Sequence, residues 1–308
     1  MQIEQEQFFC AQLAREDEEP LLGTATQVKV WLLLEYRDPW AAKAVKDNSL
    51  APAVQSHLDE QVAAIPGSRL LFIKQQKPAH TGRRFFLVRT DEAAPSLYEF
   101  ELHRYKDLLA LDLTAVAAGS PAYSDHLRDD PLFLVCTNGK RDKCCAKFGL
   151  PMVKALLANG IENVWQSTHI GGHRYAPNTL FLPHSVNYGH LAPDQIRPAV
   201  EAYEEGRLYD LDNYRGRTYY APAVQAADTY LRRELNLLDL TAVRLQTASM
   251  EAGGLWRVSF YLPDAGEEHE ILLQISESER PFPVSCTSPA MKPVSHYRLV
   301  EQRLVSSS

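Results

Sequence analysis

Hydrophobic and polar residues follow each other along this chain with periods that predict two similar runs of strands and helices. The first run opens with an apolar strand at residues 28–36, and apolar residues at helical spacing predict a helix at 51–65. Three strand candidates follow at residues 69–74, 84–89 and 97–103, and a short helical segment at 105–111 closes the run. The predicted order is β-α-β-β-β, with a final α.

The second run has nearly the same order. A strand at residues 131–136 precedes a helix at 144–159, which ends at Gly160, and a second strand covers 162–168. A hairpin with strands at 178–182 and 186–191 follows, and a helix at 193–207 completes the run. This order, β-α-β and then β-β-α, is the minimal arrangement of a thioredoxin-like fold.

The third region is smaller and of a different kind. A helix is predicted at residues 222–236, and alternating strands at 242–248, 255–261 and 268–275. The predicted fold class is α/β (α+β), with tandem thioredoxin-like units of mixed sheets flanked by helices and a small C-terminal α+β region. The predicted boundaries are 1–120, 121–218 and 219–308.

Composition narrows the classes of function. The 308 residues are 45% hydrophobic and 23% charged, which is usual for a soluble globular protein. The net charge of −7 argues against nucleic-acid binding and against an anionic membrane surface. No apolar run approaches the roughly 18 residues of a membrane span. The acidic N-terminal segment lacks the basic region of a secretory signal, so we expect a cytoplasmic protein.

The cysteines and histidines near mid-chain carry the chemistry. Five cysteines, an odd and small number for this length, argue against a disulfide framework. Cys136 and Cys145 form a C-x8-C motif, and His169 and His173 form an H-x3-H motif. Each pair lies where a predicted strand of the second unit meets its loop. The two loops of a right-handed β-α-β unit emerge at neighbouring sites, so the four side chains are expected to converge on a metal.

The spacing indicates which kind of metal centre is present. A C-x8-C motif is more open than the C-x2–4-C knuckle of structural zinc sites. A zinc protease helix needs Glu after the first histidine, where this chain has Ile170. The glycines between the histidines also disfavour a helix. Two cysteines and two histidines are the ligand set of Rieske-type [2Fe–2S] centres, and other distributions of the ligands over the two irons stay open.

Two segments carry a resemblance to a known family. Residues 136–146 (CTNGKRDKCCA) and 168–178 (THIGGHRYAPN) resemble the sucrase/ferredoxin-like family of thioredoxin-like [2Fe–2S] ferredoxins. Residues 23–25 (GTA), 35–40 (EYRDPW), 214–217 (YRGR) and 222–226 (PAVQA) are similar to it as well. The resemblance covers roughly residues 10–235 and is most specific at the metal motif.

The resemblance implies that Cys136, Cys145, His169 and His173 bind the cluster. Cys144 stands beside the expected ligand and departs from the family pattern, and we expect Cys145 to bind because it completes the motif. The first unit has no cysteine after its opening strand, so only the second unit is expected to carry chemistry. The family name does not imply sucrose hydrolysis, which needs two positioned carboxylates.

The ligand set has consequences for reactivity. Two ferric ions, two sulfides and two thiolates sum to a neutral core, so the potential should lie above that of a four-cysteine ferredoxin. Imidazole ligands add a proton site, and the potential should fall at high pH. We expect an electron carrier rather than a stand-alone enzyme, with a reductase or an electron acceptor as its partner. The chain has no dinucleotide-binding fingerprint.

Several other residues have competing interpretations. Basic residues crowd the motif and suit either an acidic partner or a solvated loop: Lys140, Arg141, Lys143, Lys147 and Arg174. Cys10 and Cys286 are interpreted as core or incidental thiols. Pro177 precedes a strand where thioredoxin-like folds often hold a cis proline.

Two alternative functions use the same residues differently. A structural zinc protein would use the four predicted ligands without redox chemistry. A thiol oxidoreductase of thioredoxin type would need reactive thiols, but its C-x-x-C motif is missing. A disulfide between the adjacent Cys144 and Cys145 would be strained.

Overall fold

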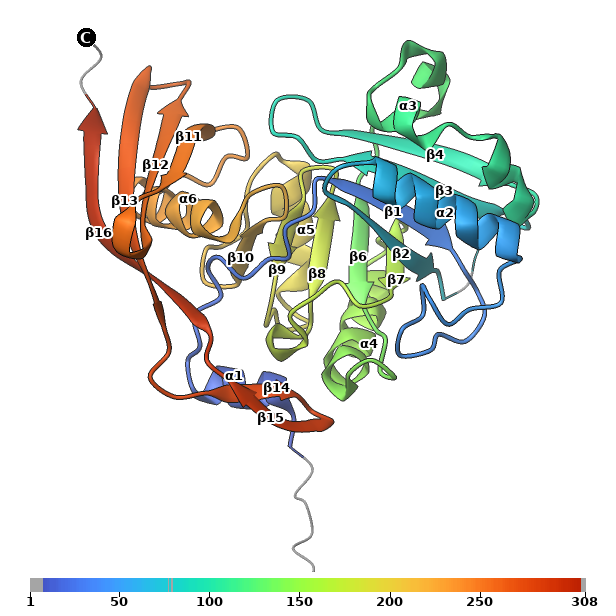
Figure 1. Cartoon of the computed structure of the whole chain (residues 1–308), viewed down its shortest axis with the longest axis horizontal. Coiled ribbons are helices and arrows are strands. Elements are labelled where there is room, and N and C mark those ends of the chain that lie inside the picture. The colour runs from blue at the N-terminus through green and yellow to red at the C-terminus, as the bar shows by residue number, and fades with distance from the viewer. Residues whose placement is uncertain (1–7, 77, 79, 306–308) are drawn as a thin grey trace, which may run out of the picture.

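The computed structural model describes residues 8–76, 78 and 80–305. Its α-helices are α1 (Cys10–Glu16), α2 (Pro52–Ala64), α3 (Leu113–Ala117), α4 (Lys143–Ala158), α5 (Ile196–Glu204) and α6 (Pro222–Leu235). Its strands are β1 (Val30–Glu35), β2 (Ser68–Lys74), β3 (Arg83–Arg89), β4 (Ser96–Leu102), β5 (Leu127–Arg128), β6 (Leu132–Cys136), β7 (Val164–Ser167), β8 (Thr179–Leu182), β9 (Val186–Tyr188), β10 (Tyr214–Arg217), β11 (Arg244–Met250), β12 (Leu255–Leu262), β13 (Glu267–Glu277), β14 (Phe282–Ser285), β15 (Ser288–Lys292) and β16 (Ser295–Val305). The α+β class and the predicted order of both runs are confirmed (Figure 1).

The two predicted runs share one sheet of ten strands, in the order β10-β9-β8-β6-β7-β2-β1-β3-β4-β5. We call β1–β4 with α2 and α3 the N-terminal unit, and β6–β10 with α4 and α5 the central unit. In each unit the first two strands are parallel, and the third strand pairs antiparallel with the first. The units join through an antiparallel contact between β2 and β7, with Ile73 opposite Ser167. The same strand order therefore occurs twice.

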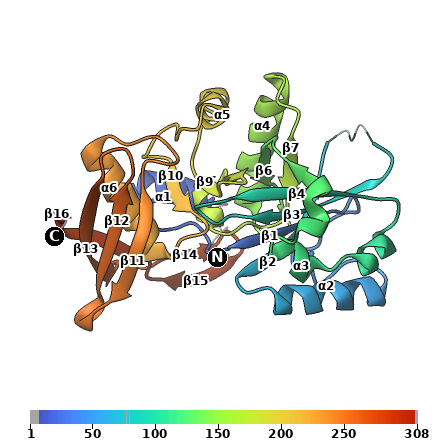
Figure 2. The same ribbon diagram turned by 90° about the horizontal axis from the view of Figure 1, so that it is seen from above.

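The helices of the two units lie on opposite sides of the molecule. Figure 2 shows α4 and α5 on one outer side and α2 and α3 on the other. A buried cluster formed by both units includes Trp31, Leu33, Leu134 and Leu180. Burial of a side chain of this size contributes roughly 1.5–3 kcal/mol to folding. Cys136 and Cys145 belong to the same cluster, so the predicted metal ligands lie at the core that joins the units.

The C-terminal region forms a separate antiparallel sheet in the order β11-β12-β13-β16, and α6 packs on it. The β14–β15 hairpin leaves this sheet and lies beside α1 near the central unit (Figure 1). None of the helices in the described part of the chain is both long and apolar enough to cross a membrane.

The structure also contains elements that the sequence pattern does not predict. These are α1, α3, β5, β10 and β14–β16. The predicted helical segment at 105–111 is a 3-10 helix, Tyr105–Ala110. The cis peptide expected before Pro177 is confirmed.

Candidate metal centre

The structure brings three of the four predicted ligands into direct proximity. Cys136 ends β6, Cys145 lies in the first turn of α4, and His169 follows β7. Their ligand atoms all lie within 4.8 Å of one another. His169 Nδ1 is 3.7 Å from the Cys145 sulfur and 4.0 Å from the Cys136 sulfur. Both thiols are buried, whereas His169 is partly exposed.

His173 lies on the same side, with its ring centroid 5.5 Å from that of His169. Its Nε2 donates a hydrogen bond of 2.6 Å to the carbonyl oxygen of Val284. Because a carbonyl can only accept, the hydrogen of the neutral ring is on Nε2 and Nδ1 keeps a lone pair. Nδ1 is buried and has no hydrogen-bond partner among the described residues. This nitrogen is therefore free to bind a metal.

The loop between the two cysteines is a tight turn that starts α4. The carbonyl of Asn138 accepts hydrogen bonds from the backbone nitrogens of Arg141 and Asp142. Asp142 is the N-cap of α4, and its carboxylate accepts from the backbone nitrogen of Cys144 at 2.9 Å. Cys145 therefore lies within the first helical turn, near the positive end of the helix dipole.

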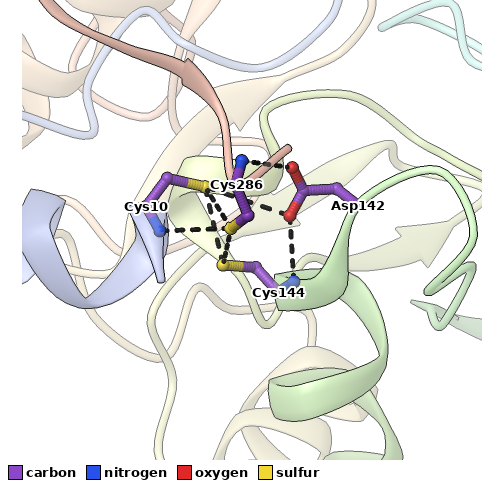
Figure 3. A group of neighbouring side chains, drawn as sticks. All are labelled: Cys10, Asp142, Cys144 and Cys286. Atoms are coloured by element: carbon purple, nitrogen blue, oxygen red, sulfur yellow. Dashed lines mark hydrogen bonds between the residues drawn. The ribbon is translucent and has the colours of Figure 1, made fainter. Parts of the chain in front are cut away.

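The adjacent thiols of Cys144 and Cys145 point to different places. Successive side chains on a helix are rotated by about 100°. Cys145 faces Cys136 and His169, whereas the Cys144 sulfur lies near those of Cys10 and Cys286 (Figure 3). The geometry thus groups Cys145, and not Cys144, with the other predicted ligands.

The glycines between the two histidines are required by the backbone and by the available space. Gly171 has φ +129° and Gly172 has φ +67°, values that side-chain-bearing residues rarely adopt. A Cβ at Gly171 would collide with Thr26 Oγ1, and one at Gly172 would collide with Arg215 Nη2. The loop can therefore fold back over the cysteines only with glycine at both positions.

Two arginines hold this histidine loop from opposite sides. Arg69, on β2 of the N-terminal unit, donates hydrogen bonds of 2.6 Å to the carbonyls of His169 and Ile170. Arg215, on β10, donates to the Gly171 carbonyl at 3.2 Å. Burial lowers the pKa of both arginines, that of Arg215 to about 10, so Arg215 stays cationic at neutral pH. Sequence reasoning missed Arg69, because only the packing of the two units places it here.

The two thiols of the centre differ in acidity. A hydrogen bond from Cys145, assisted by His169 and opposed by burial, holds the pKa of Cys136 well below its usual range. The hydrogen bond to Cys136, together with burial, raises the pKa of Cys145.

A basic cleft of about 390 Å³ opens beside His169. Its cationic lining residues are Lys43, Lys46, Arg69 and Arg141. Lys140, Lys143 and Lys147 are also exposed nearby in sequence. Arg174 is different, because it forms an ion pair of 2.9 Å with the buried Glu19. It is therefore not one of the free charges around the motif.

Sequence reasoning missed a second cluster of potential ligands. Cys10 and Cys286, interpreted as incidental thiols, lie with Cys144 and Asp142 in one group. No local spacing connects residues 10, 144 and 286. The one signal in the sequence is the number of cysteines: the C-x8-C motif uses two of the five, and three remain without an assigned role.

Comparison with known proteins supports the resemblance. The family model described as Sucrase/ferredoxin-like matches residues 21–216, which is more than half of the chain. No solved structure matches the chain.

Curated relatives match a smaller part of this chain than the family model does. A protein of Meyerozyma guilliermondii named "Altered inheritance of mitochondria protein 32" is 33% identical over 98 residues, which are 28% of this chain and 34% of the relative. Proteins of the same name from Debaryomyces hansenii and Candida glabrata are 33% and 28% identical and are covered over 35% and 34% of their lengths. The chain thus spans about a third of each of these relatives.

Proposed function

This chain belongs to the sucrase/ferredoxin-like family, and we propose that it is a one-electron carrier that holds a [2Fe–2S] cluster. Its ligands would be Cys136, Cys145, His169 and His173. The observation that carries the proposal is the meeting of Cys136, Cys145 and His169, with the buried Nδ1 of the neighbouring His173 left without a hydrogen-bond partner among the described residues. Such a cluster, when bound, supplies one-electron oxidation and reduction.

The donor atoms and their surroundings suit this group. Thiolate and imidazole are the two ligand types of Rieske-type clusters. The Val284 carbonyl fixes the tautomer of His173, which is the usual arrangement for a metal-bound histidine. Arg69 and Arg215 hold the loop that carries both histidines, so the ligands are positioned before metal binding.

The two histidines would have different roles. The Nε2 hydrogen of His173 is engaged by a backbone carbonyl, whereas His169 is partly exposed and lines the cleft. Proton exchange coupled to electron transfer would therefore go through His169. Electrons would leave on the same side, because His169 is the predicted ligand that lines the cleft.

The basic cleft supports an acidic redox partner. Lys43, Lys46 and Arg141 are exposed around His169, although the whole chain has a net charge of −7. A local positive surface steers a negatively charged partner to the site and raises its association rate at low salt. The predicted partner is a reductase or an electron acceptor with an acidic docking face.

A structural zinc site is the second candidate, and one observation favours it. A tetrahedral ion with sulfur and nitrogen ligands gives S–N edges of about 3.6 Å. The distances of His169 Nδ1 to the two sulfurs, 3.7 and 4.0 Å, are close to this value. Zinc would explain the clustering of the ligands but would give no redox activity.

The experiment that separates the two is anaerobic purification from iron-replete cells, with iron, sulfide and zinc analysis and EPR of the reduced protein. We expect two irons and two labile sulfides per chain, both lost in His169→Ala and Cys145→Ser. Zinc without labile sulfide, lost in the same two variants, would overturn the proposal in favour of the structural site.

The cytoplasmic location stays a prediction. The relatives' printed name refers to mitochondria, and it describes proteins of which this chain covers about a third. Fractionation of cells that express the full chain, followed by immunoblotting, tests the location directly.

A further inference from the structure

Three cysteines that are distant in sequence meet at one corner of the central unit (Figure 3). Cys10 opens α1, Cys144 lies in the first turn of α4, and Cys286 lies in the turn between β14 and β15. The sulfur of Cys144 is 3.5 Å from that of Cys10 and 3.1 Å from that of Cys286. The third side of the triangle, between Cys10 and Cys286, measures 3.3 Å. A carboxylate oxygen of Asp142 lies 4.0 Å from the Cys10 sulfur.

These distances between ligand atoms are near those expected around a single tetrahedral ion. A zinc ion with bonds of about 2.3 Å to sulfur and about 2.0 Å to oxygen gives S–S edges of about 3.8 Å and S–O edges of about 3.5 Å. The observed S–S edges are about 0.3–0.7 Å shorter, and the observed S–O edge about 0.5 Å longer, than these ideal values. We propose that Cys10, Cys144, Cys286 and Asp142 bind one zinc ion in a Cys3Asp site, separate from the centre formed by Cys136, Cys145, His169 and His173.

Backbone donors at two of the three sulfurs, those of Cys144 and Cys286, suit thiolates. The backbone nitrogens of Cys10 and Ala11 donate hydrogen bonds to the sulfurs of Cys286 and Cys144, at 3.3 and 3.4 Å. Hydrogen bonds to the charged form favour that form, and the first turn of α4 adds a favourable dipole at Cys144. On binding, the ion replaces the three thiol protons, which pass to solvent.

The Asp142 carboxylate is also held in a fixed position, as a ligand of the proposed ion should be. Its two carboxylate oxygens accept hydrogen bonds from the backbone nitrogens of Cys144 and Cys286, at 2.9 and 3.0 Å. The carboxylate is fully buried. It stands among the thiols on the side of His173, whose Nε2 is 3.6 Å away. The bound ion would offset the negative charge of the carboxylate and the thiolates.

The donor set favours zinc over the other thiophilic metals. Zinc is of borderline softness and accepts thiolate and carboxylate together, whereas Cu(I) selects sulfur ligands. An iron–sulfur cluster distributes its cysteines over separate irons, which places their sulfurs farther apart than 3.1–3.5 Å. A compact triangle of thiols therefore suits one ion.

The ion would staple three segments of the chain. A two-stranded hairpin such as β14–β15 is marginally stable alone. Cys286 would fix its turn to α4, and Cys10 would fix α1 to the same point. Val284 of the hairpin accepts the hydrogen bond from His173. By fixing the hairpin, the ion would therefore also keep Val284 against that histidine.

Metal analysis of paired variants of the full chain tests the site. We expect one zinc per chain in the wild type and in the double variant Cys136→Ser/Cys145→Ser, whose substitutions lie in the other centre. The double variant Cys10→Ser/Cys286→Ser should lose the zinc and keep its other metal. Loss of zinc from the first double variant with retention in the second would overturn the proposal.

A spectroscopic measurement keeps the test independent of how the Cys10 and Cys286 variants fold. Zinc X-ray absorption of the Cys136→Ser/Cys145→Ser protein should show three sulfurs at about 2.3 Å and one oxygen at about 2.0 Å. A shell of nitrogen ligands or copper in place of zinc would overturn the site. So would a disulfide between two of the three thiols, detected by alkylation and mass spectrometry of freshly isolated protein.

Discussion

The N-terminal and central units share one strand order but end their first strands differently. Cys136 ends β6, whereas Glu35 ends β1. The Glu35 carboxylate is buried and accepts hydrogen bonds from Arg37 at 2.6 Å, His80 at 2.7 Å and the backbone nitrogen of Arg84 at 2.9 Å. The same position in the two units therefore holds either a carboxylate that its neighbours satisfy or a thiol that lies beside other proposed metal ligands.

The difference shows that the topology fixes where the last residue of the first strand lies, and that the type of residue there decides whether the position is structural or can bind a metal. In the central unit, the segments after β6 and β7 bring Cys136, Cys145 and His169, three of the proposed ligands, toward each other. In the N-terminal unit, the corresponding position is closed by a structural ion-pair network. The N-terminal unit still acts on the centre, because its Arg69 holds the carbonyls of His169 and Ile170.

Substitution of the two strand-end residues should give the largest contrast. Cys136→Ser removes one of two proposed thiolate ligands, so the iron content should fall at least about tenfold, since loss of even an outer-shell partner costs about 10–100-fold in affinity. Glu35→Gln should leave the iron content unchanged. Iron and sulfide assays on both proteins measure the contrast, and equal losses in the two variants would show that the units are not functionally distinct.

Stability should show the opposite contrast. Glu35→Ala leaves Arg37 and His80 without their buried partner, and removal of one member of a buried ion pair costs about 3 kcal/mol. Glu101→Ala, on β4 of the same sheet, breaks a half-exposed pair with Arg84 and should cost under about 1 kcal/mol. Urea unfolding gives both values. A cost at Glu35 no larger than that at Glu101 would contradict the structural role of the buried network.

Two glycines of the central unit test whether the loop that carries His169 and His173 is preformed. Gly172 and Gly160 have similar backbones, with φ +67° and +77°, but only Gly172 is crowded, by Arg215. Alanine at Gly160 should cost about 1 kcal/mol from the left-handed backbone alone. Alanine at Gly172 should cost about 2–3 kcal/mol, because Arg215 must also move. Iron binding should weaken only in Gly172→Ala, and equal behaviour of the two variants would argue against a preformed loop.

The two units should also respond to acid in different pH windows. Burial lowers the pKa of His184 and His190, both in the central unit, from 6.5 to about 4. The folded protein then binds fewer protons than the unfolded chain between these values, so stability falls as the pH drops from 6.5 to 4. The slope is about 1.4 kcal/mol per pH unit for each histidine.

Glu35 behaves differently. Burial alone would raise its pKa, but hydrogen bonds from Arg37, His80 and the backbone of Arg84 lower it below 4.5. Its contribution is therefore complete above pH 4.5 and is lost as the pH falls through its folded value. Urea unfolding between pH 7 and 4.5 should show a reduced slope in His184→Gln/His190→Gln and an unchanged slope in Glu35→Gln. The same slope in all three proteins would refute this assignment.

Much of the fold could be predicted because its strands are continuous apolar runs. The predicted strand at 28–36 and helix at 144–159 differ from β1 and α4 by only one or two residues at each end. Strand β10 was missed because Arg215 and Arg217 are buried and carry the pattern of a polar surface segment. The β14–β15 hairpin and β16 were missed because most of their described side chains are exposed or half-buried and give no clear alternation.

Only those residues of the candidate site that belong to a local sequence motif were predicted. Cys136, Cys145 and His169 sit at the ends of predicted strands or the start of a predicted helix, so their proximity follows from the topology. Arg69 comes from the other unit, and Cys10 and Cys286 come from segments with no shared pattern. Tertiary packing brings Arg69 to the centre and Cys10 and Cys286 to the second cluster, and the periodicity of the sequence does not encode that packing.

The meeting of Cys10 with Cys286 has a consequence for the order of events during protein synthesis. The two residues are separated by 276 positions, so their corner cannot close until Cys286 has left the ribosome. The central unit can form earlier, since its ligands lie between residues 136 and 173. Contacts of such long sequence separation form slowly, because the intervening chain must first be ordered. The hairpin over His173 would then be the last part of this region to assemble, and until then the proposed centre would be open to metal delivery.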